Sequence, residues 1–175
     1  MAATLPDCDS LFRAHRDVAY RVAYRLLGNE SDALDAVQDG FVNVLTHMGR
    51  FRAQSSFRTW LLRIVSNAAI DIGRGRKRRD NRYRGSQTDD LLPVPDSCEP
   101  VDFGLERADL RKQLNLALAE LPEAQRQTFV LHVDGELSYR EVAEVLGISI
   151  GTVMSRLFYA RLKLREALLT QGVTL

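Results

Sequence analysis

The residues with the clearest chemical use lie in the segment LSYREVAEVLGISIGTVMSRLFYARLKLREAL, residues 137–168. A set of hydroxyl, phenolic and cationic side chains recurs there at helical spacing and shares one face: Thr152, Ser155, Arg156, Tyr159 and Lys163. Hydroxyls and cations suit phosphates and base edges, so this face is typical of a helix that reads duplex DNA. An apolar set at the same spacing predicts the packed face of that helix: Val153, Leu157, Ala160, Leu164 and Leu168.

The residues before this helix carry turn and capping signals. Ser138 is followed three residues later by Glu141, which predicts a capping box at the start of a short helix. Gly147 stands where that helix must stop in a left-handed conformation, and Ser149 can cap the next helix. A short helix, a glycine turn and a capped longer helix predict a helix-turn-helix. The alternative is an ordinary helical hairpin with a solvated polar face.

A second chemical set combines aromatic rings with arginines in residues 48–84. Trp60, Arg63 and Asn67 are spaced to share one helix face, and Phe51 offers a further ring. Proteins that hold single strands combine cationic grooves with stacking platforms and pockets for extruded bases. The segment therefore predicts a single-strand contact, and the alternative is that Trp60 simply belongs to the core.

A dense basic tract follows this segment: Arg74, Arg76, Lys77, Arg78, Arg79, Arg82 and Arg84. Such a tract can extend a DNA contact onto duplex phosphates. A solvated helix end is the alternative. Acidic residues then dominate residues 89–109, so the net charge of +1 conceals two segregated surfaces.

An acidic cluster lies earlier in the chain. Asp35, Gln38 and Asp39 are neighbours at i, i+3 and i+4 on an expected helix. The helix macrodipole favours carboxylates near this N-terminal end, which explains part of the cluster without any function. Docking onto a basic or amide-rich partner surface is the alternative.

Composition excludes several classes of protein. The 175 residues are 45% hydrophobic and contain no run that predicts a membrane span or a secretory signal, so we expect a cytoplasmic protein without membrane insertion. Cys8 and Cys98 are isolated, and the three histidines lack ligand spacing, so we expect no metal. The sequence contains no catalytic or phosphate-binding motif. We therefore expect no enzyme and no cofactor.

Apolar periodicity predicts only helices. We expect them at residues 11–27, 32–48, 56–72, 110–121 and 122–133, followed by the helix-turn-helix. The segment GSQTDDLLPVPDSCEP is rich in proline and acids and predicts a flexible linker, although an ordered surface loop is an alternative. The expected fold is all-α: two small helical domains, residues 1–84 and 104–175, joined by a linker at 85–103. The second is a four-helix module that contains the helix-turn-helix.

Taken in order, these pieces resemble a bacterial sigma factor of the extracytoplasmic-function (ECF) group. The residues that carry the match are DALDAVQDGFVNVL (32–45), FRAQSSFRTWLLRIVSNAAID (51–71) and LPEAQRQTFVLHVDGELSYREVAEVLGISIGTVMSRLFYARLKL (121–164). Their order, spacing and separating linker cover nearly the whole chain.

The resemblance implies roles for the first domain, which in this family is sigma region 2. It binds the clamp helices of the beta-prime subunit of core RNA polymerase, and the matching positions or their supports are Asp35, Gln38, Asp39 and Phe41. It also captures the melted minus-ten promoter element, with a flipped base held by the loop at 51–53 and by Asn67. The full set of implied minus-ten positions is Phe51, Arg52, Ala53, Trp60, Arg63, Asn67, Arg74, Arg76, Lys77 and Arg78.

For the second domain the resemblance implies sigma region 4, which reads the minus-thirty-five element as a duplex. The matching positions are Ser138, Tyr139, Thr152, Ser155, Arg156, Tyr159 and Lys163. Two residues depart from the family pattern: Met154 stands where Arg or Lys is frequent, and Ala53 replaces a common glycine.

The resemblance also implies partners. These are promoter DNA, core polymerase through its beta-prime clamp and beta flap, and a separate anti-sigma protein. In the family the linker crosses the active-site channel of the polymerase. The competing hypotheses are a helix-turn-helix regulator that binds duplex DNA alone, often as a dimer, and a small nuclease. Sequence-specific gel shifts without polymerase favour the former, and metal-dependent DNA cleavage favours the latter.

Overall fold

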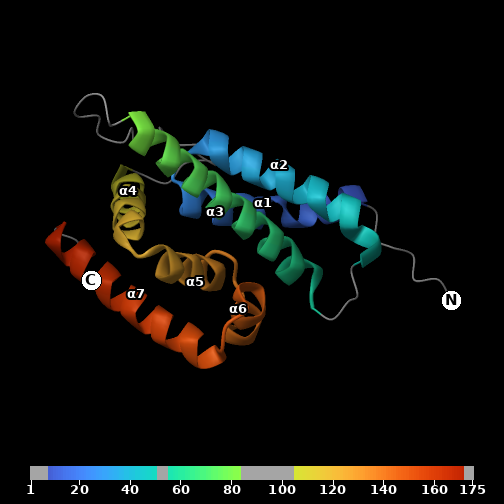
Figure 1. The fold of residues 1–175 in the computed structure, drawn as a ribbon. Coiled ribbons are helices and arrows are strands. Elements are labelled where there is room, and N and C mark those ends of the chain that lie inside the picture. Colours follow the sequence, from blue (N-terminus) through green and yellow to red (C-terminus); the bar gives the residue numbers. More distant parts are fainter. Residues whose placement is uncertain (1–7, 51–54, 84–104, 172–175) are drawn as a thin grey trace.

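The computed structural model describes residues 8–50, 55–83 and 105–171, and these ranges consist of helices joined by short turns, without strands (Figure 1). The helices are α1 Cys8–Leu27, α2 Glu30–His47, α3 Phe57–Tyr83, α4 Leu105–Glu120, α5 Glu123–Val133, α6 Tyr139–Leu146 and α7 Ile150–Thr170, with a 3-10 turn, η1, at Met48–Arg50. The expected all-α class is confirmed. The predicted linker at 85–103 lies outside the described residues.

Helices α1, α2 and α3 pack against one another and form the first half of the molecule. Asn29 begins α2, because its side-chain oxygen accepts a hydrogen bond from the backbone N–H of Asp32 at 2.8 Å. The apolar faces of the three helices meet in a core that includes Val22, Val44 and Leu61, all at most 1% exposed. This packing fixes which face of α2 remains in water.

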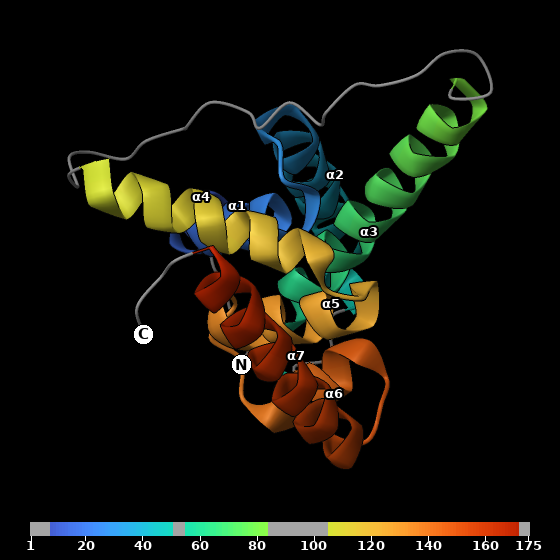
Figure 2. The same cartoon turned by 90° about the vertical axis from the view of Figure 1, so that its left-hand side faces the viewer.

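Helix α3 is longer than the sequence predicted. Apolar periodicity stops at Ile72, but the helix continues through the basic tract to Tyr83. Arginine and lysine are good helix formers, so the helix persists where its apolar face has ended. The far end of α3 projects away from the rest of the molecule (Figure 2).

Helices α4 to α7 form the second half, as the expected four-helix module. The predicted proline boundary is displaced by one residue: Pro122 is the N-cap of α5, and the helix itself begins at Glu123. Between α6 and α7 the chain bends by 104°, within the usual range of about 90–120° for a helix-turn-helix.

The two halves pack against each other. Helices α5 and α6 lie between α7 and the first half, while α2 and α7 occupy opposite sides of the molecule (Figures 1 and 2). A single buried apolar cluster contains residues of both halves, among them Leu61, Leu62, Leu131 and Val142. The sequence predicted two domains and left their relative orientation open.

Leu34, Leu45 and Leu110 recur at helical spacing with the other apolar residues of 32–48 and 110–121, which predicts burial, but all three are exposed. Leu34 and Leu45 of α2 are each 51% exposed, and Leu110 of α4 is 46% exposed. In α2 the core takes Val37, Phe41 and Val44. Since Leu34 and Leu45 are about three turns apart, they lie on the same side of α2, at the edge of that face but at different heights along the helix.

Helices α2 and α3 approach most closely at Gly40. A Cβ atom added there would lie 2.5 Å from Cγ2 of Val65. We therefore expect Gly40→Ala to lower the free energy of unfolding by about 1–2 kcal/mol, because overpacking costs about 1–3 kcal/mol and the gain in helix propensity returns only about 0.5–1 kcal/mol. Urea denaturation followed by circular dichroism measures the change.

Gly75 supplies the matched control. It also lies inside a helix, α3, but a Cβ added there would meet no atom within 4 Å. Gly75→Ala is expected to raise the free energy of unfolding by about 0.5–1 kcal/mol through helix propensity alone. Equal stabilities of the two variants would show that α2 and α3 are not in tight contact at Gly40.

Candidate nucleic-acid interface

The helix-turn-helix begins with the predicted capping box. The Ser138 backbone N–H donates to the Glu141 carboxylate at 2.9 Å, and the Glu141 backbone N–H donates to the Ser138 hydroxyl at 3.3 Å. Hydrogen bonds from Ser138 lower the pKa of the Glu141 carboxyl below its ordinary value. Gly147 ends α6 with a left-handed φ of 63°, which glycine adopts without steric cost. Ser149 then caps α7.

The predicted DNA-reading face of α7 lies largely at the surface. Ser155, Tyr159 and Lys163 are exposed, while Thr152 and Arg156 are half-buried. The Ser155 hydroxyl donates to the Thr152 carbonyl at 3.0 Å, so it is already engaged within the helix. Tyr159 and Lys163 are therefore the more available side chains for a duplex.

The other two predicted positions of this set lie at the start of α6. Ser138 is exposed and forms the capping box, while Tyr139 is half-buried with its ring centroid 4.9 Å from that of His132. Ser138 therefore contributes to the helix start, and Tyr139 packs on α5. Both roles position α7.

A second exposed face of α7 was not predicted. Ile150, Met154, Phe158 and Leu162 recur at four-residue steps and are 43–64% exposed. Three of them line a shallow pocket, together with Tyr139 and two arginines, Arg161 and Arg165. Met154, which stands where the family often has Arg or Lys, lies on this apolar face and not on the DNA-reading face. The four-residue repeat is visible in the sequence. It was not used for a prediction, because the apolar stripe that includes Val153 already explained how the helix packs.

The predicted single-strand contact is only partly described. Phe51, Arg52 and Ala53 lie outside the described residues. Trp60 is half-buried and packs against the core, and its ring makes an edge-to-face contact with that of Phe57 at a centroid distance of 6.1 Å. Arg63 donates to the carbonyl oxygen of Val145 at 3.3 Å and to that of Glu144, and Asn67 is exposed. Of these side chains, Asn67 is accessible, and Arg63 is engaged by α6.

The basic tract contains arginines that form ion pairs with acidic side chains and other cations that are exposed to water. Arg74 forms an ion pair with Glu123 at 2.6 Å, and this hydrogen bond raises the pKa of the Arg74 guanidinium. Arg76 pairs with Asp32 at 2.8 Å and donates to the Leu27 carbonyl, so it ties α3 to the start of α2. Two further members of the predicted site, Lys77 and Arg78, are exposed, and Nε of Arg78 donates to the Arg74 carbonyl at 3.3 Å.

Helix α2 presents the predicted docking residues to water. Asp35, Gln38 and Asp39 are exposed. Phe41 is 7% exposed, and its ring centroid lies 4.6 Å from that of Phe12. Phe41 therefore supports this surface from the core and does not face a partner.

Apolar side chains join the acidic ones on the outer face of α2. Leu34, Val42 and Leu45 are 51–56% exposed. We call this surface, formed by Leu34, Asp35, Gln38, Asp39, Val42 and Leu45, the α2 face. Mixed apolar and charged surfaces of this kind are typical of protein–protein contacts. The exposed leucines were missed because the sequence assigned them to the core.

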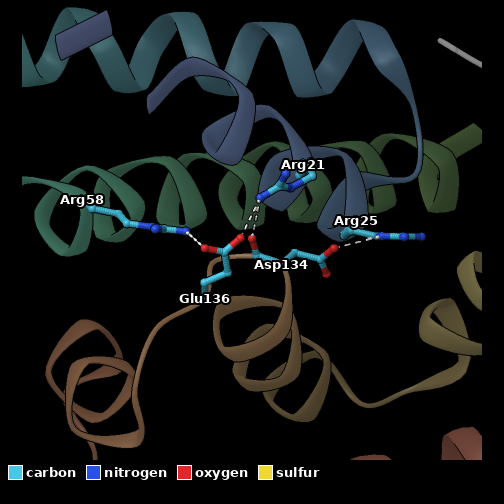
Figure 3. Close-up of polar contacts among 5 residues, drawn as sticks. All are labelled: Arg21, Arg25, Arg58, Asp134 and Glu136. Atoms are coloured by element: carbon cyan, nitrogen blue, oxygen red, sulfur yellow. Dashed lines mark hydrogen bonds and ion pairs between the residues drawn. The ribbon is translucent and has the colours of Figure 1, made fainter. Parts of the chain in front are cut away.

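The halves meet through arginines of the first half and acceptors of the turn between α5 and α6 (Figure 3). Arg58 donates to the Glu136 carboxylate at 2.8 Å, and Arg21 donates to the same carboxylate at 3.3 Å. Arg25 donates to the Asp134 carboxylate at 3.3 Å. The bond from Arg58 lowers the pKa of the Glu136 carboxyl, whereas burial raises that of Asp134 against the opposing effect of Arg25.

Within the described ranges, no group of three histidine, cysteine or acidic side chains is placed to hold a metal ion. No single helix in those ranges is long and apolar enough to cross a membrane.

Two family models match the chain. Sigma-70 region 2 matches residues 11–79, and Sigma-70, region 4 matches residues 111–164. The first match covers most of α1, all of α2 and most of α3, and the second covers most of α4, all of α5 and α6, and most of α7.

Curated relatives and a solved structure agree with these matches. The chain is 36% identical to the ECF RNA polymerase sigma factor SigE of Mycolicibacterium smegmatis, over 95% of this chain and 63% of that protein. It is 32% identical to the ECF RNA polymerase sigma factor SigW of Bacillus subtilis, over 88% of this chain and 84% of that protein. The chain thus spans just under two thirds of SigE and most of SigW.

The fold is similar to that of the sigma factor RpoE, solved in complex with the anti-sigma factor NepR from Bartonella quintana. The TM-score is 0.73 at 24% identity, and the match covers 94% of this chain and 98% of that chain.

Proposed function

This chain belongs to the ECF group of RNA polymerase sigma factors, and we propose that it binds core RNA polymerase, directs it to specific promoters and helps to melt the promoter DNA. One observation carries the proposal. A capped helix-turn-helix, bent by 104°, stands on the same chain as an exposed acidic and apolar α2 face. A DNA reader that acts as a monomer without polymerase has no need of the second surface.

We assign the two ends of the promoter to the two halves. The first half, residues 1–84, docks on the polymerase through the α2 face and holds the minus-ten element with Asn67, Lys77 and Arg78, together with residues 51–53. The second half, residues 104–175, reads the minus-thirty-five element with the polar face of α7. Arg156, Tyr159 and Lys163 supply the cationic and phenolic contacts that base edges and phosphates accept.

The same assignment gives roles to the linker and predicts where the chain acts and how it is regulated. Residues 85–103 form the linker that crosses the polymerase channel, where their acidity suits a basic environment. The chain acts in the cytoplasm, carries no catalytic site of its own, and is restrained by a separate anti-sigma protein.

Run-off transcription tests the proposal directly. Purified chain is added to core polymerase with a library of genomic fragments, and we expect transcripts that start at a small set of promoters and require the chain. No promoter-dependent product on any fragment would reject the proposed function. Tight, sequence-specific gel shifts by the chain alone would instead identify a regulator that acts without polymerase.

A further inference from the structure

Two helices on opposite sides of the molecule gather exposed apolar side chains. One is α2, with the α2 face defined above. The other is α7, and we call its exposed apolar residues the α7 apolar face: Ile150, Met154, Phe158 and Leu162. More than half of the large apolar side chains that are exposed in the described part of the chain lie on these two faces. Apolar groups that are gathered in this way, unlike scattered single ones, mark surfaces that another molecule covers.

The two faces carry opposite charges. Asp35 and Asp39 lie one turn apart on the α2 face. Arg161 and Arg165 lie one turn apart on α7 and line the shallow pocket of the α7 apolar face. All four side chains are exposed, and none forms an ion pair within the described ranges. Complementary charges of this kind select a partner surface and fix its orientation.

The charged and apolar groups follow opposite orders along the two helices. Apart from Leu34, the α2 face places its two aspartates before its apolar residues, Val42 and Leu45. The α7 apolar face begins with Ile150 and Met154, and the two arginines follow. Two helices that run antiparallel therefore bring acids beside cations at one end and apolar groups together at the other. A parallel arrangement would instead set the cations of one face against the apolar end of the other.

The faces also match in length. At 1.5 Å per residue, the α2 face rises about 17 Å from Leu34 to Leu45, and the α7 apolar face rises about 18 Å from Ile150 to Leu162. An antiparallel pair also sets the positive N-terminal end of each helix beside the negative C-terminal end of the other. Charge, apolar order and length therefore favour the same arrangement.

One molecule cannot bring its own two faces together in this structure. Helices α2 and α7 lie on opposite sides of the molecule, with other helices between them (Figures 1 and 2). We propose that the α2 face of one molecule docks, antiparallel, on the α7 apolar face of a second copy, so that the free chain associates with itself head to tail. Because the two faces are different surfaces, each added copy leaves one face of each kind open for the next.

The contact is weak and reversible. One helix face, about 18 Å long and about 10 Å wide, offers far less than the roughly 800 Å² per partner of a stable interface. We therefore expect a dissociation constant above about 1 µM. At low concentration the chain is a monomer, and copies associate only when the chain is in surplus.

Self-association has a consequence for regulation, and this consequence rests on the proposed function. The α2 face is the surface proposed to dock on core polymerase, and it holds one occupant at a time. A second copy of the chain and core polymerase therefore compete for it. A surplus of free chain covers its own docking faces, which limits how far overproduction raises the concentration of chain available to polymerase.

Sedimentation velocity of the full chain tests the contact without polymerase or DNA. In reducing buffer, over concentrations on both sides of the expected dissociation constant, the weight-average sedimentation coefficient of the parent is expected to rise. Val42→Glu and Phe158→Glu each place a carboxylate among the apolar groups of one face. Each is expected to weaken association at least about tenfold. Their parent side chains are 56% and 64% exposed, and glutamate is a good helix former, so both variants are expected to keep their helices by circular dichroism.

An equimolar mixture of these two variants identifies the contact. The Val42→Glu variant keeps its α7 apolar face, and the Phe158→Glu variant keeps its α2 face. The mixture is therefore expected to form one contact per pair and to stop at a 1:1 dimer. Leu110→Glu is the matched control, because it makes the same kind of change at a leucine of α4 that is 46% exposed and lies outside both faces. This control is expected to associate like the parent.

Several results would overturn the head-to-tail contact. They are a parent that stays monomeric at every concentration, association that persists in both variants, and a mixture that does not dimerise. Association lost in only one variant would indicate a symmetric dimer through that face and would overturn the contact as well.

The competition has a separate readout. At one core polymerase per chain, the assemblies are expected to dissolve into 1:1 complexes of chain and polymerase. Assemblies that persist, together with normal run-off transcription, would overturn the competition and leave the proposed function standing. Failure of run-off transcription with unchanged self-association would reject the proposed function and leave the head-to-tail contact standing.

Discussion

Reversing the charge of the α2 face by Asp35→Arg with Asp39→Arg is expected to weaken binding to core polymerase at least about tenfold, equivalent to about 1.4 kcal/mol. Both carboxylates are exposed, and neither forms an ion pair within the described ranges. The substitutions therefore remove no internal contact. They place cations on a surface whose acidity selects a basic partner surface, so repulsion replaces attraction.

Affinity for core polymerase is measured by titration of fluorescently labelled chain, and circular dichroism verifies folding. The control is Asp17→Arg with Glu120→Arg, which makes the same change in net charge on exposed sites of α1 and α4. We expect the control to bind core polymerase like the parent. Unchanged affinity in the α2 variant, with native circular dichroism, would remove the α2 face from the polymerase contact.

Truncation of the polar face of α7 is expected to abolish the reading of the minus-thirty-five element. In the variant Arg156→Ala with Tyr159→Ala, two side chains proposed to contact the duplex are lost. Each good base contact is worth about 1–3 kcal/mol of discrimination, so the preference for an intact over a scrambled element should fall at least about tenfold. Alanine is the best helix former, so α7 is expected to persist.

The measurement is the ratio of transcripts from two templates that differ only in the minus-thirty-five element, at saturating variant. A ratio isolates promoter reading from any change in polymerase affinity. Phe158→Ala with Arg161→Ala is the matched control, since it removes an aromatic and an arginine from the other exposed side of the same helix. A preserved ratio in the Arg156 and Tyr159 variant would show that this face does not read the element.

Local signals in the sequence predicted the elements of this fold well. The capping box at Ser138, the stop at Gly147 and the cap at Ser149 were each read from residue type and spacing, and each is present. These features depend on a few neighbouring residues, so the sequence determines them locally. The end of α3 was wrong by about three turns, because an amphipathic pattern marks where a helix packs and not where it stops.

Features that depend on residues far apart in the chain could not be predicted from the sequence. The exposure of Leu34 and Leu45 is set by where α1 and α3 pack on α2, which periodicity within α2 does not encode. The pairing of Arg58 with Glu136 joins residues 78 positions apart, and each alone reads as an ordinary surface charge. The proposed DNA and polymerase contacts remain predictions, and the burial of Phe41 favours the supporting role over direct contact.

The apolar cluster shared by the two halves has a consequence for the unbound chain inside a cell. Because one cluster runs through both halves, separating them brings part of it into water. Exposed apolar surface of that kind promotes self-association and exposes a chain to proteases. The packing of the two halves therefore also sets how long an unbound pool of the chain survives, and a variant whose halves separate is expected to be short-lived.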